Sequence, residues 1–273
     1  MTLDLIEINP TKNYKEENFP VASWLLSKKV RSQVLTFYKF ARAADDIADS
    51  PKLSPQEKIK RLDMFEKAIE SNKSKISKVE TLKKICFQNK IKVDHALNLL
   101  KAFKQDATKK RYKNWNELIN YCRYSAVPVG RFVIDLHKED KISYKYSDPL
   151  CIALQILNHI QDCKEDYKKI NRVYLPESFL NKYEVKLSQL NKDYIDKNLR
   201  LAIDEILLHT EKLIKQADKF KKIMKNKKLS NETTFILEIA KKLHKLLKEK
   251  DPLGKKVVLN KLDYIKCFAK SFL

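Results

Sequence analysis

Apolar residues recur at spacings of three and four along most of this 273-residue chain, and strict alternation of apolar and polar residues is nowhere sustained. Such spacing is typical of helices that bury one face, whereas a half-buried strand would alternate. We therefore predict an all-α fold. The clearest helical segments are predicted at residues 54–70, 115–136, 148–167, 190–224 and 231–248.

Local signals mark where several of these helices begin or bend. Residues 54–57 (SPQE) combine a capping serine, a proline in the first turn and a glutamate three residues after the cap. An Asp-Pro pair at 148–149 similarly predicts a helix start. Pro128 lies inside the segment 115–136 and should bend or break it. Residues 168–187 are predicted to form a connecting loop.

Glycine is scarce, since only Gly130 and Gly254 occur. Hairpin turns commonly use glycine, so this scarcity also argues against a β fold. Two isolated glycines cannot form a P-loop or a GxGxxG dinucleotide motif, and phosphate binding would therefore depend on metal ions and side chains. The chain shows no repeat, low-complexity linker or sharp change of composition, so residues 1–273 are predicted to form a single domain.

The chain is strongly basic, with 57 Lys and Arg residues against 35 Asp and Glu residues and a formal net charge of +22. Lysine supplies most of the positive charge and is spread over the whole length. Specific nucleic-acid readers tend to gather arginine or stacking aromatic residues on one element, so no nucleic-acid partner is expected. A solvated lysine-rich surface is one interpretation, and attraction to an anionic membrane surface is the other.

Cysteine usage and the first residues indicate a cellular compartment. Five cysteines occur without CxxC spacing, as free thiols in a reducing compartment would. The first residues are partly acidic and lack the basic and apolar regions of a secretory signal. No apolar run approaches the roughly 18 residues needed to cross a bilayer. We expect a cytoplasmic protein, with peripheral contact at the cytoplasmic face of the membrane as an option.

One apolar segment, residues 34–50, carries a stripe of polar side chains. Tyr38, Arg42, Asp45 and Asp49 are spaced there at i, i+4, i+7 and i+11. On an α-helix these positions lie along one face. Leaving a buried polar group without a partner costs roughly 1–3 kcal/mol, so a polar stripe on an apolar helix needs partners or a ligand.

A second apolar segment repeats this pattern with Gln155, Asn158, Asp162 and Asp166 at i, i+3, i+7 and i+11. Two such helices facing each other would line a cavity with four carboxylates, which cannot converge in a low dielectric without cations. Oxygen ligands without a His or Cys cluster suit Mg²⁺, which also takes water and substrate phosphate oxygens. The pattern thus predicts a site that holds a diphosphate and assists its departure.

Two acid pairs of this spacing are close to what the composition supplies by chance. On many helices such a pair lies on a solvated face and pairs with lysines. From the residues alone, the metal–diphosphate site and the solvated face both stay open. The five histidines show no metal-ligand spacing, so packing or hydrogen-bonding roles are favoured for them.

Several segments in order along the chain resemble the squalene/phytoene synthase family. They cover most of residues 17–180, whereas the later residues match only in being helical and amphipathic. The resemblance implies an isoprenoid-synthase helical bundle with a central cavity. The matching segments are 18–23, 37–49, 121–126, 128–131, 154–166 and 172–176.

The resemblance also implies ligands for metal ions. Two or three Mg²⁺ ions would bind together with the diphosphate of a prenyl substrate. Gln155 and Asn158 would stand beside the second aspartate pair as supporting polar groups that help to bind the substrate. The residues implied to bind the metal ions, directly or through water, are Asp45, Asp49, Asp162 and Asp166.

Further residues are implied to contact the substrate. Arg42 and Arg172 would contact the diphosphate, for which a guanidinium is well shaped. The residues implied to line the pocket or to donate hydrogen bonds to phosphate or to the departing oxygen are Ser23, Tyr38, Tyr121 and Tyr174. Each tyrosine has a competing role in the core. The aromatic residues that could stabilise a carbocation, again with a core role as the alternative, are Phe19, Phe37, Phe40, Tyr38 and Phe132.

Two positions favour one branch of the family. Pro128 and Gln161 stand where members that condense two prenyl diphosphates tend to carry glycine and arginine, and both differences lean toward the branch that forms hydroxysqualene in the bacterial hopanoid pathway. That branch, a carbon–oxygen lyase, would ionise presqualene diphosphate, and water would quench the rearranged cation to hydroxysqualene. No NADPH would be needed, and a presqualene diphosphate synthase is a possible partner.

Two alternatives remain. A condensing member would join two prenyl diphosphates head to head into presqualene diphosphate, squalene or phytoene. A catalytically silent relative would keep the helical fold as an assembly or scaffold protein. Such a relative would be expected to lose the aspartates, all four of which are present here together with Arg42 and Arg172.

Overall fold

The computed structural model describes residue 14, residue 23 and residues 25–273, so the segment 18–22 of the family resemblance, with Phe19, lies outside the described residues. Contacts divide the chain into two compact units. Unit 1 comprises Met1–Lys109 and Tyr124–Lys141, and unit 2 comprises Lys110–Arg123 and Ile142–Leu273. The prediction that residues 1–273 form a single domain stays a prediction.

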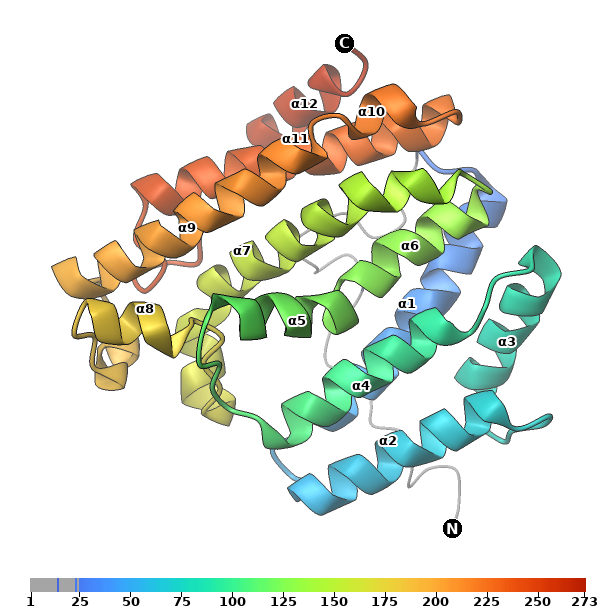
Figure 1. Cartoon of the computed structure of the whole chain (residues 1–273), viewed down its shortest axis with the longest axis horizontal. Helices are drawn as coiled ribbons and strands as arrows, with labels where there is room; N and C mark the ends of the chain where they lie inside the picture. Colours follow the sequence, from blue (N-terminus) through green and yellow to red (C-terminus); the bar gives the residue numbers. More distant parts are fainter. Residues whose placement is uncertain (1–13, 15–22, 24) are drawn as a thin grey trace. The chain divides into compact units, whose positions relative to one another are not determined.

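Unit 1 is built around the helix that carries the first polar stripe. This helix, α1, packs against α2, α3 and α4, and α4 also contacts α2 and α6 (Figure 1). The stripe is therefore held by a helix with neighbours on several sides. The described helices of unit 1 are α1 (Lys28–Asp49), α2 (Pro55–Glu70), α3 (Ser77–Asn89), α4 (Asp94–Thr108) and α6 (Val127–Leu136).

Phenylalanine side chains fill the interior of unit 1. Phe40 and Phe65 are fully buried, with 6.0 Å between their ring centroids. Phe37 of α1 stacks on Phe132 of α6 with 4.1 Å between ring centroids. Burying a side chain of this size stabilises a fold by roughly 1.5–3 kcal/mol. Phe37, Phe40 and Phe132, considered above for cation stabilisation, are thus core residues of unit 1.

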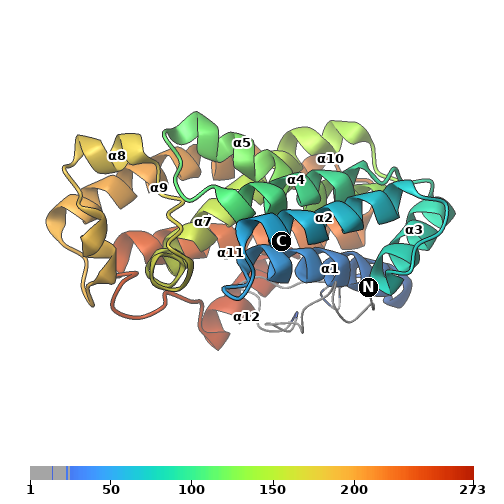
Figure 2. The ribbon, with the colours of Figure 1, turned by 90° about the horizontal axis from the view of Figure 1, so that it is seen from below.

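Unit 2 is built around α7, the helix that carries the second polar stripe. It packs against α9 and α11, α9 contacts α8 and α11, and α11 also contacts α10 and α12 (Figure 2). The last two residues of α5 belong to unit 1. The described helices of unit 2 are α5 (Trp115–Ser125), α7 (Tyr144–Ile170), α8 (Glu177–Lys182), α9 (Lys197–Ala217), α10 (Phe220–Ile223), α11 (Lys227–Glu249) and α12 (Lys261–Lys270).

Two of the boundaries expected from local signals are confirmed. α2 begins at Pro55, and the Ser54 hydroxyl caps it by accepting a hydrogen bond from the Glu57 backbone N–H at 3.2 Å. The segment 115–136 breaks into α5 and α6 around Ala126, two residues before Pro128. Proline lacks a backbone N–H and is tolerated in the first turn of a helix, where Pro128 lies.

The expected start of α7 at the Asp-Pro pair is wrong. The helix begins at Tyr144, and Pro149 lies inside it. Pro149 removes only one backbone donor near the start of a 27-residue helix. Because α7 packs against α9 and α11, tertiary contacts hold the helix past this position.

Three further expectations require correction. The segment 190–224 contains α9, which begins only at Lys197 because Asp196 caps it by accepting from a backbone N–H, and the separate short α10. α11 begins before residue 231, since Asn226 caps it in the same way. The expected loop 168–187 contains α8, which follows Pro176.

The all-α prediction is confirmed for the described residues. They contain no strand, and an isolated bridge pairs Arg111 with Val173. Among the described helices, none combines the length and the apolar character that crossing a membrane requires.

Candidate active site

The first polar stripe lies on α1 and is neither fully buried nor fully exposed. Tyr38, Arg42, Asp45 and Asp49 are all half-buried, whereas Phe37, Ala44 and other neighbours on the helix are buried. A solvated helix face would leave such side chains exposed. The sequence-based alternative of a lysine-paired solvated face therefore fits α1 less well than a lined pocket does.

Arg42 organises the carboxylates of this stripe. Its Nη2 lies 3.0 Å from Asp45 Oδ2, and its Nη1 lies 3.7 Å from Asp46 Oδ1. Asp46 is buried, with 2% of its surface exposed. One guanidinium thus faces two carboxylates, and Asp49 follows one turn later on the same stripe.

The carboxyl group of Asp45 is unfavourable as an anion in this environment. Burial, as the largest cause, and the charge of Asp49 together raise its pKa to about 8 against the lowering effect of Arg42. The carboxylates of Asp106 and Asp46 act in the same direction as Asp49. Oxygen ligands that repel one another in a partly dry site fit a divalent cation, which would offset their repulsion.

Asp106 is a site residue that the sequence reasoning missed. It lies on α4 and is buried, with 2% of its surface exposed, and α4 packs against α1 within unit 1. A sequence signal existed, because Asp106 falls next to Phe103 and Ala107 on the apolar face of its helix. An acid on an apolar face requires a nearby charge partner or ligand.

Ser23 lies in a local turn of the backbone. Its hydroxyl accepts a hydrogen bond from the Leu25 backbone N–H at 3.2 Å, and its carbonyl accepts from the Leu26 N–H at 3.2 Å. This position just precedes α1, whose cap is Ser27. A role for Ser23 in binding substrate stays a prediction.

The second polar stripe lies on α7. Gln155, Asn158, Asp162 and Asp166 are all half-buried, while Ile156 and other neighbours are buried. The two stripes, one in each unit, therefore show the same pattern of exposure. This agreement was expected from their matching spacing.

A loop from the last part of the chain covers the end of this stripe. The ammonium group of Lys256 lies 2.7 Å from Asp162 Oδ1. Gln161 is buried and donates a hydrogen bond from its Nε2 to the Val257 carbonyl. Lys164 donates to the Leu253 carbonyl at 2.8 Å. Lys256 could not be anticipated from the sequence, because no local pattern relates it to α7.

Tyr121, Arg172 and Tyr174 meet inside unit 2. Arg172 Nη1 donates to the Tyr174 hydroxyl at 3.1 Å, and the hydroxyls of Tyr121 and Tyr174 lie 3.3 Å apart. Three of the residues implied for catalysis thus form one hydrogen-bonded chain. All three are buried.

His159 extends this cluster. Its ring stacks on Tyr174 with 3.6 Å between ring centroids. Burial lowers the pKa of His159 to about 3, and the nearby Arg172 charge contributes in the same direction. The imidazole is therefore neutral at physiological pH, as a packing or hydrogen-bonding role requires.

The described side chains do not form a complete metal site by themselves. Among the residues that the structure describes, no three His, Cys, Asp or Glu side chains cluster closely enough to hold a metal ion. Mg²⁺ commonly binds through one or two carboxylates and takes its other ligands from water and phosphate. Each aspartate pair fits that kind of site, in which water and phosphate supply the other ligands.

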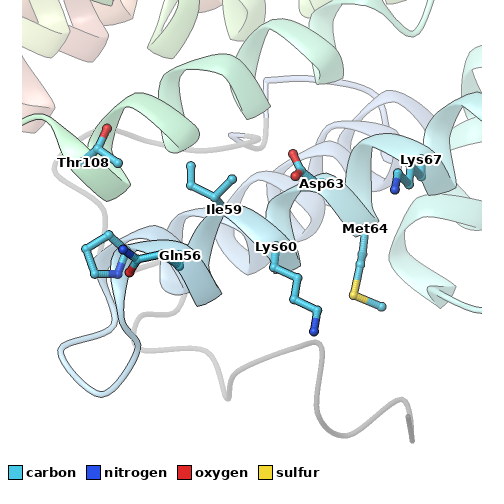
Figure 3. Close-up of a pocket in the computed structure, with 8 residues that line it drawn as sticks. Gln56, Ile59, Lys60, Asp63, Met64, Lys67 and Thr108 are labelled. Carbon is cyan, nitrogen blue, oxygen red and sulfur yellow. The ribbon is translucent and has the colours of Figure 1, made fainter.

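A pocket of about 650 Å³ lies elsewhere in unit 1, along α2 (Figure 3). None of the predicted site residues lines it. In Figure 3, Lys60 and Met64 extend away from the helix that carries Thr108. We assign it no part in the candidate site. Its lining residues are Pro55, Gln56, Ile59, Lys60, Asp63, Met64, Lys67 and Thr108.

Known proteins resemble this chain over most of its length. The profile of the family described as squalene/phytoene synthase matches residues 13–263. A protein of Sinorhizobium fredii named hydroxysqualene synthase is 38% identical over 252 residues, which cover 92% of this chain and 86% of that protein. A Rhodopseudomonas palustris protein of the same name is 36% identical, and the match covers 95% of this chain and 89% of that protein.

Solved structures share the fold. The squalene synthase HpnC from Alicyclobacillus acidocaldarius superposes with a TM-score of 0.76 at 23% identity, covering 86% of this chain and 90% of that one. A dehydrosqualene synthase superposes with a TM-score of 0.79 at 19% identity, covering 94% of this chain and 91% of that one. The family profile, the curated relatives and the shared helical fold agree: the chain is an enzyme that belongs to the squalene/phytoene synthase family.

Proposed function

We propose that this enzyme ionises presqualene diphosphate in a Mg²⁺-dependent reaction and lets water quench the cation to hydroxysqualene and diphosphate. One observation carries the proposal: three proteins named hydroxysqualene synthase are 36–38% identical to this chain over at least 92% of its length. Proteins named phytoene synthase match less well, at 25–27% identity over 60–66% of the chain.

In this reaction the carbon–oxygen bond of the substrate breaks and its electron pair leaves with the diphosphate. The cyclopropylcarbinyl cation rearranges, the oxygen of water bonds to carbon, and the water loses a proton. No oxidant or reductant is needed, so no NADPH is involved. Diphosphate and hydroxysqualene are the two products.

Residues of α1 would prepare the leaving group. Asp45 and Asp49 would hold Mg²⁺, which as a Lewis acid neutralises the charge that develops on diphosphate. Arg42, already oriented by Asp45 at 3.0 Å, would contact a diphosphate oxygen. Asp46 and Asp106, both buried, would keep the guanidinium and the aspartates in place. Tyr38 would line the pocket one turn before Arg42.

Unit 2 carries the second set of implied ligands. Asp162 and Asp166 would hold Mg²⁺, and Gln155 and Asn158 would bind beside them. The chain from Arg172 through the Tyr174 hydroxyl to Tyr121 is preorganised by hydrogen bonds of 3.1 and 3.3 Å. Such a chain could donate a hydrogen bond to the departing oxygen without reorganising.

Gln161 supports water quenching over condensation. Condensing members tend to carry arginine at this position, whereas here a neutral side chain is buried and donates to the Val257 carbonyl. The position therefore supplies no cation for a second diphosphate. The condensing reaction remains the alternative candidate.

The test is incubation of the purified chain with Mg²⁺ and either presqualene diphosphate or farnesyl diphosphate, followed by mass spectrometry of the extracted products. We expect hydroxysqualene from presqualene diphosphate and no product from farnesyl diphosphate. Turnover of farnesyl diphosphate alone would establish the condensing alternative.

Variants separate the enzyme from a silent scaffold. Asp45→Ala should lose product formation, because it removes an implied metal ligand. Asp193→Ala is a matched control, since this aspartate is exposed and pairs with Lys164 at 2.6 Å. It should retain activity. Failure of the unaltered chain to release diphosphate from either substrate would overturn the proposal.

A further inference from the structure

Helix α12 has one face that unit 2 buries firmly. Asp263, Cys267 and Ser271, spaced at i, i+4 and i+8, are buried. Asn260 and Asp263 form a reciprocal capping box at the start of the helix. Asp263 also pairs with Lys242 of α11 at 3.0 Å. The helix is therefore formed and its rotation about its own axis is fixed.

The opposite face of α12 is apolar and exposed. We call Val258, Leu262, Ile265, Phe272 and Leu273 the apolar strip; their exposed fractions are 51%, 66%, 62%, 54% and 95%. Leu262 and Ile265 lie at i and i+3 on one side of the helix, and Phe272 follows two residues after its last residue, Lys270. The described chain has eleven exposed large hydrophobic residues, and five fall within these 16 positions. This concentration distinguishes the strip from the scattered apolar residues of an ordinary surface.

Lysines flank the apolar strip. Lys255, Lys261, Lys266 and Lys270 are exposed around it, and the sole acid between residues 254 and 273 is Asp263, which faces α11 and is paired. α10 adds a further positive charge at this end, since Lys221 donates to the Ser271 carbonyl at 3.5 Å. In Figures 1 and 2, α12 lies along α11 within unit 2.

The charge of this face selects among the partners that could cover it. A second copy of the chain would bring two lysine-rich faces together, and their repulsion would oppose the contact. An uncharged bilayer would accept the apolar side chains but offer no anionic headgroups to the lysines, of which only Lys270 has an ion pair, with Glu238 at 3.1 Å, among the described residues. A bilayer with anionic headgroups accepts the apolar side chains and also pairs with the lysines, as it does for amphipathic helices that lie in a membrane interface.

We propose that α12 is a membrane-docking helix, which inserts the apolar strip into an anionic bilayer and places its lysines among the headgroups. The inference stands independently of the reaction proposed above, because it concerns where the protein lies and not what it converts. A membrane surface would also be the natural source and sink for water-insoluble substrates and products.

The experiment is co-sedimentation of the full chain with vesicles of phosphatidylcholine alone and of phosphatidylcholine mixed with phosphatidylglycerol, at low and high salt. We expect binding to the phosphatidylglycerol vesicles that weakens at high salt. Leu262→Glu/Ile265→Glu should weaken binding by about tenfold or more, because it removes two inserted side chains and adds negative charge. Lys261→Gln/Lys266→Gln should weaken it by about 25-fold, at roughly fivefold per lysine.

A matched control tests whether position matters. Leu201→Glu/Leu208→Glu makes the same change at two exposed leucines of α9, where Asp204 and Glu205 lie nearby and no lysine-flanked strip exists. Two added negative charges weaken the overall attraction of the chain to anionic vesicles slightly. Apart from this general effect, binding of the control variant should stay within about twofold of that of the unaltered chain. Circular dichroism and thermal melting would show that each variant is folded.

Two results would overturn the proposal. One is the absence of the expected selectivity: the unaltered chain binds the anionic vesicles no better than the Leu262→Glu/Ile265→Glu variant does, or no better than it binds phosphatidylcholine vesicles. The other is a dimer of the unaltered chain in analytical ultracentrifugation that the same variant dissociates, which would make the strip an interface between copies.

Discussion

Replacing Asp45 by asparagine should stabilise the protein at neutral pH while abolishing its activity. The substitution keeps the shape of the side chain and removes the charge that burial and the neighbouring Asp49 disfavour. The direction of the stability change follows from the linkage between proton binding and folding. The folded pKa of about 8 lies above the ordinary value of 3.8, so between these pH values the folded state holds a proton that the unfolded chain releases.

The magnitude can be bounded from this difference. Between pH 3.8 and pH 7 the folded state loses stability at up to about 1.4 kcal/mol per pH unit, which gives an upper limit of about 4 kcal/mol. A quarter of the Asp45 side chain is exposed and Arg42 pairs with it, so solvent and the guanidinium screen part of this effect. We expect Asp45→Asn to be more stable by about 1–2 kcal/mol at pH 7 and by less than about 1 kcal/mol at pH 5.

Urea unfolding followed by circular dichroism at pH 5 and pH 7 measures both differences. Asp193→Asn is the matched control, because Lys164 lowers the pKa of this exposed carboxyl and its loss should destabilise slightly, with the opposite sign. Equal stability of Asp45→Asn and the unaltered chain at pH 7, or a difference that does not shrink toward pH 5, would refute the reasoning.

Three further predictions concern the same regions. Burial holds the pKa of His159 near 3, below its ordinary 6.5, so the contribution of His159 to stability should fall by about 2 kcal/mol from pH 6.5 to pH 5, and the difference in stability between the unaltered chain and His159→Phe should change by this amount in urea titrations. Tyr174→Phe should destabilise by about 1–3 kcal/mol in the same assay at pH 7, because the buried Arg172 loses an acceptor. Mg²⁺ with inorganic diphosphate should raise the melting temperature of the unaltered chain, whereas Asp45→Ala/Asp49→Ala should show little rise; equal rises would contradict a metal role.

Local signals predicted those parts of the fold that depend on neighbouring residues. The cap at Ser54 and the break near Pro128 follow from backbone hydrogen bonding within one or two turns, and both are confirmed. The start at Pro149 is wrong, because packing of α7 outweighs one missing backbone donor. Caps such as Asp196 resemble many other aspartates in the sequence until the helix that they begin is known.

The residues of the candidate site also divide into those that local spacing predicts and those that it does not. The helical spacing of Asp45 and Asp49 sufficed to place them on one half-buried stripe, as observed. Lys256 could not be predicted, because its loop reaches α7 across about 96 positions, as the neighbouring hydrogen bond from Gln161 to Val257 shows. Asp106 lies between these cases, since its place on an apolar helix face is visible in the sequence but its charge partners on α1 are not.

The source of the oxygen in the product tests the proposed ionisation most directly. Presqualene diphosphate would be turned over with Mg²⁺ in water labelled with heavy oxygen, and both products would be analysed by mass spectrometry. Ionisation of the carbon–oxygen bond and quenching by water predict the label in hydroxysqualene and none in the released diphosphate. Label in the diphosphate with an unlabelled alcohol would mean attack at phosphorus, and would contradict ionisation of the substrate by this enzyme.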